Sequence, residues 1–457
     1  MPDVLRLRPP SVERLLTVVR RRVDGRRSGA ALLAAARTTI AEERRRLASG
    51  LAQRPIDQLA TATLERLDSP ARAAVPTAIN GTGVIIHTNL GRAPWPRAAI
   101  EAAAAATGTL LLELDQETGR RGQRYRVVED QLIALTGAED ALVTNNNAAA
   151  VALAVGLAGR GGGVVVSRGE LVEIGGGVRI PEIVRRAGAR LIEVGTTNRT
   201  RAADFEAPLV EGRARLVLRV HPSNFRQSGF TETPDSAAVA ALAHRHAAIV
   251  IDDLGSGALL ATERFGLGHE PLPAERLAAG ADLVTFSGDK LVGGPQAGLI
   301  VGRADLIARI RRDPLARATR PDKVTLAALA ATLGLYRAGL AEAEIPVWRM
   351  LATSIDELRA RAAALAARIG DATSIVDVRS TVGGGSLPGE TLPSIGLALG
   401  RASASRLLTA LRAGQPSVVA RIGDGRVIVD VRTVDPAADR ALGDAISAAL
   451  GATARRR

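Results

Sequence analysis

Short apolar runs alternate with alanine-rich stretches through the middle of the chain, from about residue 80 to residue 310. Short apolar runs separated by helix-forming segments are typical of strands in successive βαβ units. The pattern predicts an α/β domain with a largely parallel sheet. The predicted strands lie at 141–143, 164–166, 190–194, 215–220, 248–251 and 283–286.

The N-terminal region has helical periodicity instead. Ser11 offers an N-cap before apolar residues that recur every three or four positions, and residues 56–67 repeat the amphipathic pattern. Prolines within residues 70–76 interrupt helix and mark a boundary. This pattern therefore predicts a small helical domain over residues 9–75.

The C-terminal region mixes both patterns. Helices are expected around 323–340 and 350–369, and a hairpin is expected at 418–434, where Asp424-Gly425 suits a tight turn. These elements predict a smaller α+β domain. The predicted division is a basic helical domain at 1–75, a large α/β domain at 76–315 and a small α+β domain at 316–457.

Composition removes several classes of site. None of the 457 residues is cysteine, which excludes disulfides, thiolate zinc sites, iron–sulfur clusters and cysteine nucleophiles. No metal is expected either, because His244 and His246 would diverge on a helix and the other three histidines are scattered. The longest apolar run, 148–159, is shorter than the roughly 20 residues of a membrane-spanning helix, and no apolar segment follows Met1. We expect a cytoplasmic protein without a membrane partner.

Positive charge is concentrated near the N-terminus. The formal net charge is +13, and residues 1–75 contain 15 arginines against 8 acidic residues. This asymmetry favours a polyanionic partner, because arginine neutralises phosphates and releases counterions. The alternative is that solvated helix faces are arginine-rich throughout this chain. Two clusters stand out, Arg20-Arg21-Arg22 and Arg44-Arg45-Arg46.

Lysine is rare enough for each copy to be informative. Lys290 and Lys323 are the only lysines among 60 basic residues. Unlike guanidinium, a lysine amine can lose its proton and attack a carbonyl. Lys290 follows the last predicted strand of the α/β region, in FSGDKLVGGPQ, whereas Lys323 follows a proline at a predicted helix start, which favours a solvent-facing or anion-contacting role.

Four predicted strands end in polar or glycine-rich segments, and ligands collect at the carboxyl ends of strands in open α/β sheets. These segments are TNNNAAA, HPSNF, DDLGSG and SGDKLVGGPQ. Their groups fit pyridoxal phosphate, which needs a lysine for a Schiff base, an acid at the pyridine nitrogen and donors for the phosphate. The candidates are Lys290 for the amine, Asp252 or Asp253 for the acid, Ser287, Asn146, Asn147 and Ala148 for the phosphate, and His221 near the ring or substrate.

Other readings of these residues are weaker or remain open. No GxxxxGK[ST] sequence is present, and GTGVIIHTNLG lacks the glycine spacing of a dinucleotide-binding turn. A single histidine at a strand end is more often simply hydrogen bonded, so the assignment of His221 stays open beside that alternative.

Several longer segments resemble one known family from end to end. They include INGTGVIIHTNLGRAP at 79–94, LDQETGRRGQRY at 114–125, TGAEDALVTNNNAAAV at 136–151, SRGELVEIGGGVRIP at 167–181 and TFSGDKLVGGPQAGLIVG at 285–302. In this order they resemble bacterial L-seryl-tRNA(Sec) selenium transferases, or selenocysteine synthases. The resemblance implies the fold type I architecture of pyridoxal phosphate-dependent transferases, an N-terminal domain that engages tRNA rather than DNA, and a homodecamer built from dimers.

The resemblance also implies roles for individual residues. Lys290 would carry the cofactor, Asp253 would be the better partner for the pyridine nitrogen, and Asp289 would help to position substrate or lysine, with a turn-stabilising role as the alternative. Guanidinium groups bind oxyanions through paired charged hydrogen bonds. The family likeness places three of them, Arg92, Arg317 and Arg320, around selenophosphate; surface charge is the alternative for Arg317 and Arg320.

The implied reaction converts seryl-tRNA(Sec) to selenocysteinyl-tRNA(Sec) with selenophosphate, through a cofactor-bound aminoacrylyl-tRNA. The alternatives are a related fold type I enzyme that acts on a small amino compound, and an RNA-binding protein that has lost catalysis. Three positions depart from the family pattern: Gly81 replaces a common alanine, Pro321 an aliphatic residue and Phe225 a tyrosine expected near Thr196 and Thr197.

Overall fold

The chain divides into two compact units, one up to Thr77 and one from Ala78 onward. The computed structural model describes residues 8–23, 27–68, 75–122, 124, 126–174, 177–400 and 403–454. Most of the proline-containing boundary predicted at 70–76, and parts of the family segments at 114–125 and 167–181, lie outside the described residues. The three-part division stays a prediction.

The N-terminal unit is a small bundle of the predicted helices α1 (Val12–Arg20), α2 (Gly29–Ala48) and α3 (Ile56–Asp68). Ser11 caps α1, because its side chain accepts a hydrogen bond of 3.2 Å from the Arg14 backbone amide. Leu15, Ile40 and Leu59, one from each helix, are fully buried against one another. The helical periodicity of the sequence is therefore confirmed.

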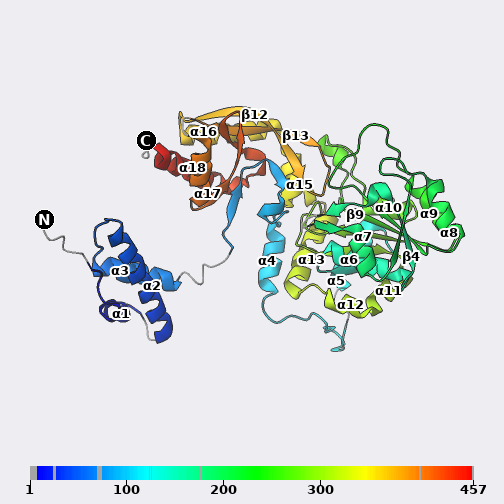
Figure 1. Cartoon of the computed structure of the whole chain (residues 1–457), viewed down its shortest axis with the longest axis horizontal. Helices are drawn as coiled ribbons and strands as arrows, with labels where there is room; N and C mark the ends of the chain where they lie inside the picture. Colours follow the sequence, from blue (N-terminus) through cyan, green and yellow to red (C-terminus); the bar gives the residue numbers. More distant parts are fainter. Residues whose placement is uncertain are drawn as a thin grey trace. The chain divides into compact units, whose positions relative to one another are not determined.

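The larger unit is built on a seven-stranded sheet in which six strands are parallel and β11 is antiparallel. The strands labelled β4 and β9 belong to this sheet (Figure 1). Its order is β3-β11-β10-β9-β8-β4-β7. All six predicted strands are confirmed. The strands are β3 (Asp140–Thr144), β4 (Gly163–Ser167), β7 (Arg190–Val194), β8 (Leu216–Val220), β9 (Ile249–Gly255), β10 (Leu283–Ser287) and β11 (Gly298–Gly302).

Helices cover both faces of this sheet. Successive residues of a strand point to opposite faces, and these strands carry apolar residues on both faces. On β4, Val164 and Val166 pack in a cluster with α6 (Asn147–Val155) and α7 (Ile180–Arg186). Val165 packs instead with α9 (Ser236–Arg245). The strands are thus buried on both faces, which explains why they appear in the sequence as continuous apolar runs.

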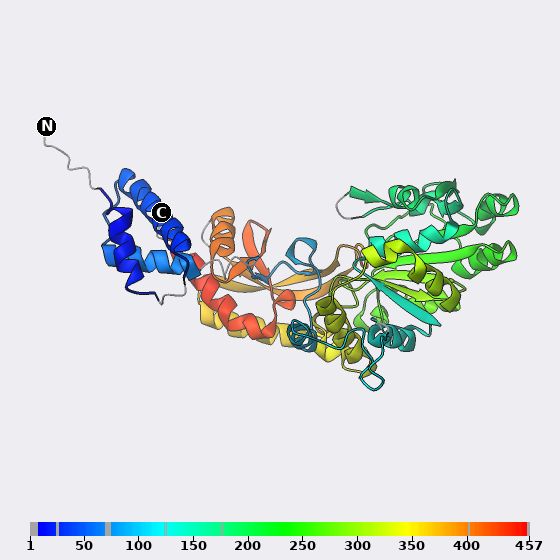
Figure 2. The same ribbon diagram turned by 90° about the horizontal axis from the view of Figure 1, so that it is seen from below.

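A second, five-stranded sheet has the order β15-β16-β13-β12-β2. Helices α16, α17 and α18 pack with it, in the yellow to red part of the ribbon (Figure 2). The predicted hairpin is confirmed, with Asp424 and Gly425 both at positive φ in its turn. These elements are β2 (Val84–Ile86), β12 (Thr373–Gly383), β13 (Thr391–Leu399), β15 (Arg421–Gly423), β16 (Arg426–Asp430), α16 (Ile355–Ile369), α17 (Ala404–Ala413) and α18 (Asp439–Ala454).

The first strands of the larger unit join this second sheet region rather than the seven-stranded sheet. β2 lies parallel to β12, and β1 (Ala78–Asn80) lies parallel to β14 (Ser417–Val419). The segment that begins the unit is therefore held by strands more than 290 residues further along the chain.

The remaining elements connect the sheets or cover them. The helices are α4 (Arg97–Ala105), α5 (Arg126–Thr136), α8 (Glu206–Val210), α10 (Pro273–Ala278), α11 (Ala304–Arg312), α12 (Pro314–Ala318), α13 (Lys323–Arg337), α14 (Ala341–Glu344) and α15 (Pro346–Ala352), and two short strands are β5 (Glu173–Ile174) and β6 (Val178–Arg179). Short 3-10 turns complete the chain, among them η2 (Thr88–Leu90). Within the described ranges, no helix combines the length and apolarity needed to cross a membrane.

Candidate active site

A cavity of about 630 Å³ lies at the carboxyl ends of the parallel strands. This is the edge at which open α/β sheets bind their ligands. The fold brings nine of the predicted residues into its wall: Arg92, Asn146, Asn147, Ala148, His221, Asp253, Ser287, Asp289 and Lys290.

Lys290 stands on the loop that joins β10 to β11. Backbone hydrogen bonds of 2.9 Å fix this loop on both sides of the lysine, from Gly288 N to the Ala297 carbonyl and from Leu291 N to the Ser256 carbonyl. The Lys290 side chain is buried, and burial followed by the nearby Arg92 charge lowers the pKa of its amine. A larger fraction of the amine is therefore neutral than in an exposed lysine.

Asp253 is a buried carboxylate in the wall of this cavity. Its Oδ1 accepts hydrogen bonds from Asn147 Nδ2 at 2.8 Å and Thr285 Oγ1 at 2.9 Å, while burial raises the pKa of its carboxyl. Asp252 does not line the cavity and lies instead 3.6 Å from Arg276 Nε. Adjacent residues of β9 point to opposite faces, so the two aspartates have different surroundings.

The start of α6 supplies backbone donors. Asn146 caps the helix by accepting a hydrogen bond of 2.9 Å from Ala149 N. The first amides of a helix lack intrahelical acceptors and favour anions. Asn147 and Ala148 stand at that first turn, and both line the cavity with Ser287.

Arg92 enters the cavity from a strained loop. Its φ of 64 is unusual for a residue with a side chain, and the preceding Gly91 is also left-handed. Arg92 Nη1 lies 3.4 Å from the Asp289 carboxylate, and Ala93 N donates a hydrogen bond of 3.2 Å to the Asp289 carbonyl. Asp289 directly precedes Lys290, so these two contacts connect the Arg92 loop to the lysine loop.

His221 faces a carboxylate that was not predicted from the sequence. Its Nε2 lies 3.3 Å from Oε1 of the buried Glu270. Both residues also line a second cavity of about 380 Å³, together with Phe225, Thr196 and Thr197. Phe225 is 37% exposed there.

Two further residues of the site were not predicted, Thr285 and Gly385. Thr285 stands inside the quoted segment TFSGDK, so its place two residues before Ser287 on the same strand was a usable signal. Gly385 belongs to a run of three glycines that begins at the last residue of β12, and none of the three was among the predicted site residues.

Arg317 and Arg320 do not reach this cavity in the single chain. Arg317 is exposed on α12, and Arg320 lines a neighbouring hollow of about 390 Å³. Gln296 belongs to the walls of both cavities, so the hollow adjoins the site. Lys323 donates hydrogen bonds to backbone carbonyls, Thr107 at 3.1 Å and Gly108, and, among the described residues, not to an anion.

The six arginines of the N-terminal clusters differ in their partners. Three lie beside acidic residues: Arg20 with Glu13 at 3.4 Å, Arg22 with Asp57, and Arg46 with Glu43 at 3.5 Å. Arg21, Arg44 and Arg45 are exposed and have no carboxylate within 4.0 Å among the described residues. In the same described ranges, no three histidine or acidic side chains gather as metal ligands.

Comparison with known proteins gives consistent matches. A family model described as L-seryl-tRNA selenium transferase matches residues 78–435. The chain is 46% identical over 403 residues to the L-seryl-tRNA(Sec) selenium transferase of Rhizobium meliloti (strain 1021), with 86% of each chain covered. It is 46% identical over 379 residues to that of Hyphomonas neptunium (strain ATCC 15444), covering 80% of this chain and 81% of the relative.

A solved structure extends the likeness to the fold. D-Glucosaminate-6-phosphate ammonia-lyase matches with a TM-score of 0.61 at 20% sequence identity, over 84% of this chain and 98% of that chain. At this identity the likeness concerns the fold alone.

Proposed function

Because the chain belongs to the L-seryl-tRNA selenium transferase family, we propose that it converts seryl-tRNA(Sec) to selenocysteinyl-tRNA(Sec), with pyridoxal phosphate as cofactor and selenophosphate as selenium donor. One observation carries the proposal beyond the likeness itself: a buried lysine, a buried aspartate and the first turn of a helix share one cavity. The protein is a fold type I enzyme of the pyridoxal phosphate-dependent class.

The residues present fit this cofactor. A Cβ built on Gly385 would lie 2.5 Å from Lys290 Nζ, so the glycine keeps open the space into which the amine points. Asn147 Oδ1 is buried and has no hydrogen-bond partner among the described residues, which leaves an acceptor at the same wall. Lys290 would hold the cofactor covalently and Asp253 would face its pyridine nitrogen. Ser287 and the α6 amides would hold its phosphate.

The cofactor supplies an electron sink for a deprotonated α-carbon when it is bound. Within the chain, the amine of Lys290 is the group that takes the α-proton of the serine, because its lowered pKa favours the neutral, basic form. His221 would lie beside the ring or the substrate, with Glu270 Oε1 3.3 Å from its Nε2. Asp289 holds Arg92 toward the cavity.

Arg92 binds the selenium donor. Selenophosphate is a small polyanion, and a guanidinium suits its oxygens. We extend this role to Arg320, whose hollow adjoins the cavity through Gln296, and to Arg317 on the preceding helix α12. In the net reaction, the C–O bond of serine and the Se–P bond of the donor break, and a C–Se bond and a new P–O bond form. The serine oxygen leaves as water and water supplies the oxygen to phosphorus, so the products are selenocysteinyl-tRNA and phosphate.

The N-terminal unit engages the tRNA through Arg20, Arg21, Arg22, Arg44, Arg45 and Arg46. Helical RNA is recognised mainly through its backbone and shape, for which exposed arginines are suited. A homo-oligomer built from dimers, up to a decamer, and a cytoplasmic location complete the proposal. The location follows from the substrate, since aminoacyl-tRNA is used where translation takes place.

An absorption experiment tests the function. Protein saturated with pyridoxal phosphate is scanned alone, with seryl-tRNA(Sec) and with ordinary seryl-tRNA, next to Lys290→Ala. We expect a visible band of lysine-bound cofactor that the variant lacks and that only the selenocysteine tRNA alters. A band indifferent to both tRNAs would favour an enzyme of small amino compounds, and the absence of a band in the wild type would overturn the proposal.

A further inference from the structure

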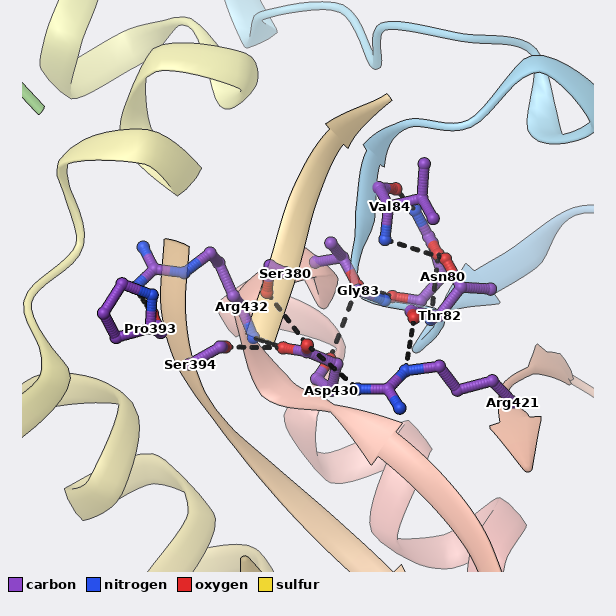
Figure 3. A network of polar contacts seen from close by, with 11 residues as sticks. Asn80, Thr82, Gly83, Val84, Ser380, Pro393, Ser394, Arg421, Asp430 and Arg432 are labelled. Atoms are coloured by element: carbon purple, nitrogen blue, oxygen red, sulfur yellow. Dashed lines mark hydrogen bonds and ion pairs between the residues drawn. The ribbon is translucent and has the colours of Figure 1, made fainter. Parts of the chain in front are cut away.

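A buried carboxylate outside the cavity organises the start of the larger unit (Figure 3). The Asp430 side chain is fully buried at the end of β16. Its Oδ1 accepts hydrogen bonds from Ser394 Oγ at 2.7 Å and Arg432 N at 3.1 Å, and its Oδ2 accepts one from Ser380 Oγ at 2.9 Å. Arg421 Nη2 lies 4.0 Å from Oδ2. One carboxylate thus joins β12, β13 and β16.

The end of β16 and the 3-10 turn that follows it also hold the turn between β1 and β2. Asp430 N donates a hydrogen bond of 2.8 Å to the Gly81 carbonyl, and Gly83 N donates one of 3.1 Å to Thr433 Oγ1. A Cβ built on Gly83 would lie 2.5 Å from Asp430 Oδ2, and φ at Gly83 is +82. The carboxylate therefore occupies the space that a side chain at Gly83 would take.

Hydrogen bonds within the turn hold its conformation, and they involve Asn80 and Thr82 of the NGTG part of the family segment. Asn80 Oδ1 accepts from Thr82 N at 3.1 Å and Thr82 Oγ1 at 2.7 Å, and Asn80 Nδ2 donates to the Val84 carbonyl at 2.9 Å. Arg421 Nε adds a hydrogen bond of 3.1 Å to the Thr82 carbonyl (Figure 3). None of these residues lines the catalytic cavity.

The strands that this network fixes both end in the cavity. β2 and β12 are parallel, with Val84 beside Thr381 and Ile86 beside Gly383. A Cβ on Gly383 would lie 2.4 Å from the Ile86 carbonyl, so the two strands approach closely at their carboxyl ends. The segment that follows β2 contains Thr88 and Arg92, and the segment that follows β12 contains Gly384 and Gly385. All four residues lie in the cavity wall.

We infer that Asp430 is a positioning residue for the selenium-donor site: by locking the β1–β2 turn onto β12, it sets where Arg92 stands relative to Lys290. Arg92 is the point at which a small displacement matters most, because its strained backbone is held by its surroundings. The role assigned to Arg92 rests on the proposed function; the placement of its loop by Asp430 does not.

Substitution of Asp430 tests the inference with matched controls. Asp430→Ala removes every acceptor, whereas Asp430→Asn keeps one oxygen for Ser394 and Arg432 N and offers an amide to the rotatable Ser380 hydroxyl. Asp282→Ala is the control for buried-aspartate loss: Asp282 accepts from Val250 N at 2.8 Å and Arg303 Nη1 at 3.0 Å, and it precedes the amino end of β10, away from the cavity.

We expect Asp430→Ala to raise the KM for selenophosphate about tenfold or more, and to weaken binding of inorganic phosphate as a competitor similarly, with the KM for seryl-tRNA(Sec) nearly unchanged. Asp430→Asn should recover most of that loss. Asp282→Ala should lower Tm without this split between the two KM values. The same behaviour in Asp430→Ala as in Asp282→Ala would overturn the inference.

Two further experiments test the inference if Asp430→Ala does not fold or if the proposed function is wrong. If Asp430→Ala does not fold, Ser380→Ala and Ser394→Ala each remove one hydrogen bond and should raise the KM for selenophosphate by a smaller factor. If the wild type does not use selenophosphate, the proposed function is wrong. Hydrogen exchange then tests separately whether Asp430 positions the Arg92 loop. Amides of residues 88–92 should exchange faster in Asp430→Ala than in the wild type or in Asp282→Ala, and equal exchange would refute it.

Discussion

A Cβ atom built on Gly385 would lie 2.5 Å from Nζ of Lys290, and φ at Gly385 is +88. A side chain at this position would therefore push the lysine amine from its place while also straining the backbone. We predict that Gly385→Ala loses most of its covalently attached pyridoxal phosphate. Borohydride reduction followed by mass spectrometry of the Lys290 peptide measures the attached fraction.

Gly389→Ala is the matched control for that variant. Gly389 has a similar φ of +80, but a Cβ there would meet nothing within 4 Å. Both alanines cost about 1 kcal/mol or more of backbone strain, so only the contact with Lys290 differs. Equal loss of cofactor in the two variants would show that strain in the loop, and not contact with the lysine, is responsible.

The two aspartates of β9 give the second prediction. Asp253→Asn should weaken cofactor binding and lower kcat by about 100-fold or more, because a neutral amide does not stabilise a protonated pyridine nitrogen. Asp252→Asn should stay within a few-fold of the wild type, since Asp252 faces Arg276 outside the cavity. Titration of cofactor-free protein with pyridoxal phosphate and single-turnover rates measure both effects; the reverse order would reassign the acid to Asp252.

The sequence predicted much of this site because its residues follow the strands of one sheet. Asn146, His221, Asp253 and Lys290 each stand at the carboxyl end of a strand in that sheet or just beyond it, and parallel strands bring such ends together. The choice between Asp252 and Asp253 could not be made in the same way. Which residue of a strand faces the ligand depends on the helices that pack on each side.

Other parts of the site come from segments that a local pattern cannot connect. Gly385 reaches Lys290 from the second sheet, and Arg92 reaches Asp289 from a loop whose strand pairs with β12. Pairing between strands almost 300 residues apart is decided by tertiary packing and not by periodicity. Glu270 follows no predicted strand, so only the fold shows that it faces His221.

The N-terminal arginines give the third prediction. Arg21, Arg44 and Arg45 are free of acidic partners among the described residues, whereas Arg20, Arg22 and Arg46 are paired. Unpaired arginines can neutralise phosphates without first breaking an ion pair. Replacing the unpaired three with alanine should weaken tRNA binding more than replacing the paired three, and should reduce the slope of log K against log salt by about 0.7 to 0.9 for each phosphate that is no longer neutralised.

Filter binding or fluorescence anisotropy at several salt concentrations measures this difference. Circular dichroism of each triple variant checks that the helices persist, because loss of the Arg22 pair with Asp57 removes an ion pair between the turn that follows α1 and helix α3. Equal affinities for the two triple variants would indicate that the tRNA binds to other residues.

The last prediction concerns stability and pH, through Glu129 on α5. The Glu129 side chain is fully buried, and Arg311 Nη2 lies 3.1 Å from its Oε1. Burial raises the pKa of its carboxyl to about 7, in spite of the Arg311 charge and with a contribution from nearby Asp140. The folded protein therefore keeps this proton at pH values where the unfolded chain has lost it.

The sign of the effect follows from this difference in bound protons. The contribution of Glu129 is fully present below the ordinary glutamate pKa of about 4.5, and it is lost as the pH rises through about 7. Over that interval the free energy of unfolding should fall by up to about 1.4 kcal/mol per pH unit from this group. Glu129→Gln cannot ionise, so its Tm should exceed that of the wild type increasingly between pH 5 and pH 7.5, values that bracket most of this window.

Thermal unfolding in matched buffers measures this change, with Asp130→Asn as the control. Asp130 is the next residue on the same helix, but it is exposed and paired with Arg126 at the surface. An exposed pair contributes little, so Asp130→Asn should follow the wild-type dependence on pH. A difference between Glu129→Gln and the wild type that stays constant from pH 5 to pH 7.5 would mean that Glu129 remains ionised in the folded protein, with Arg311 outweighing the cost of burial.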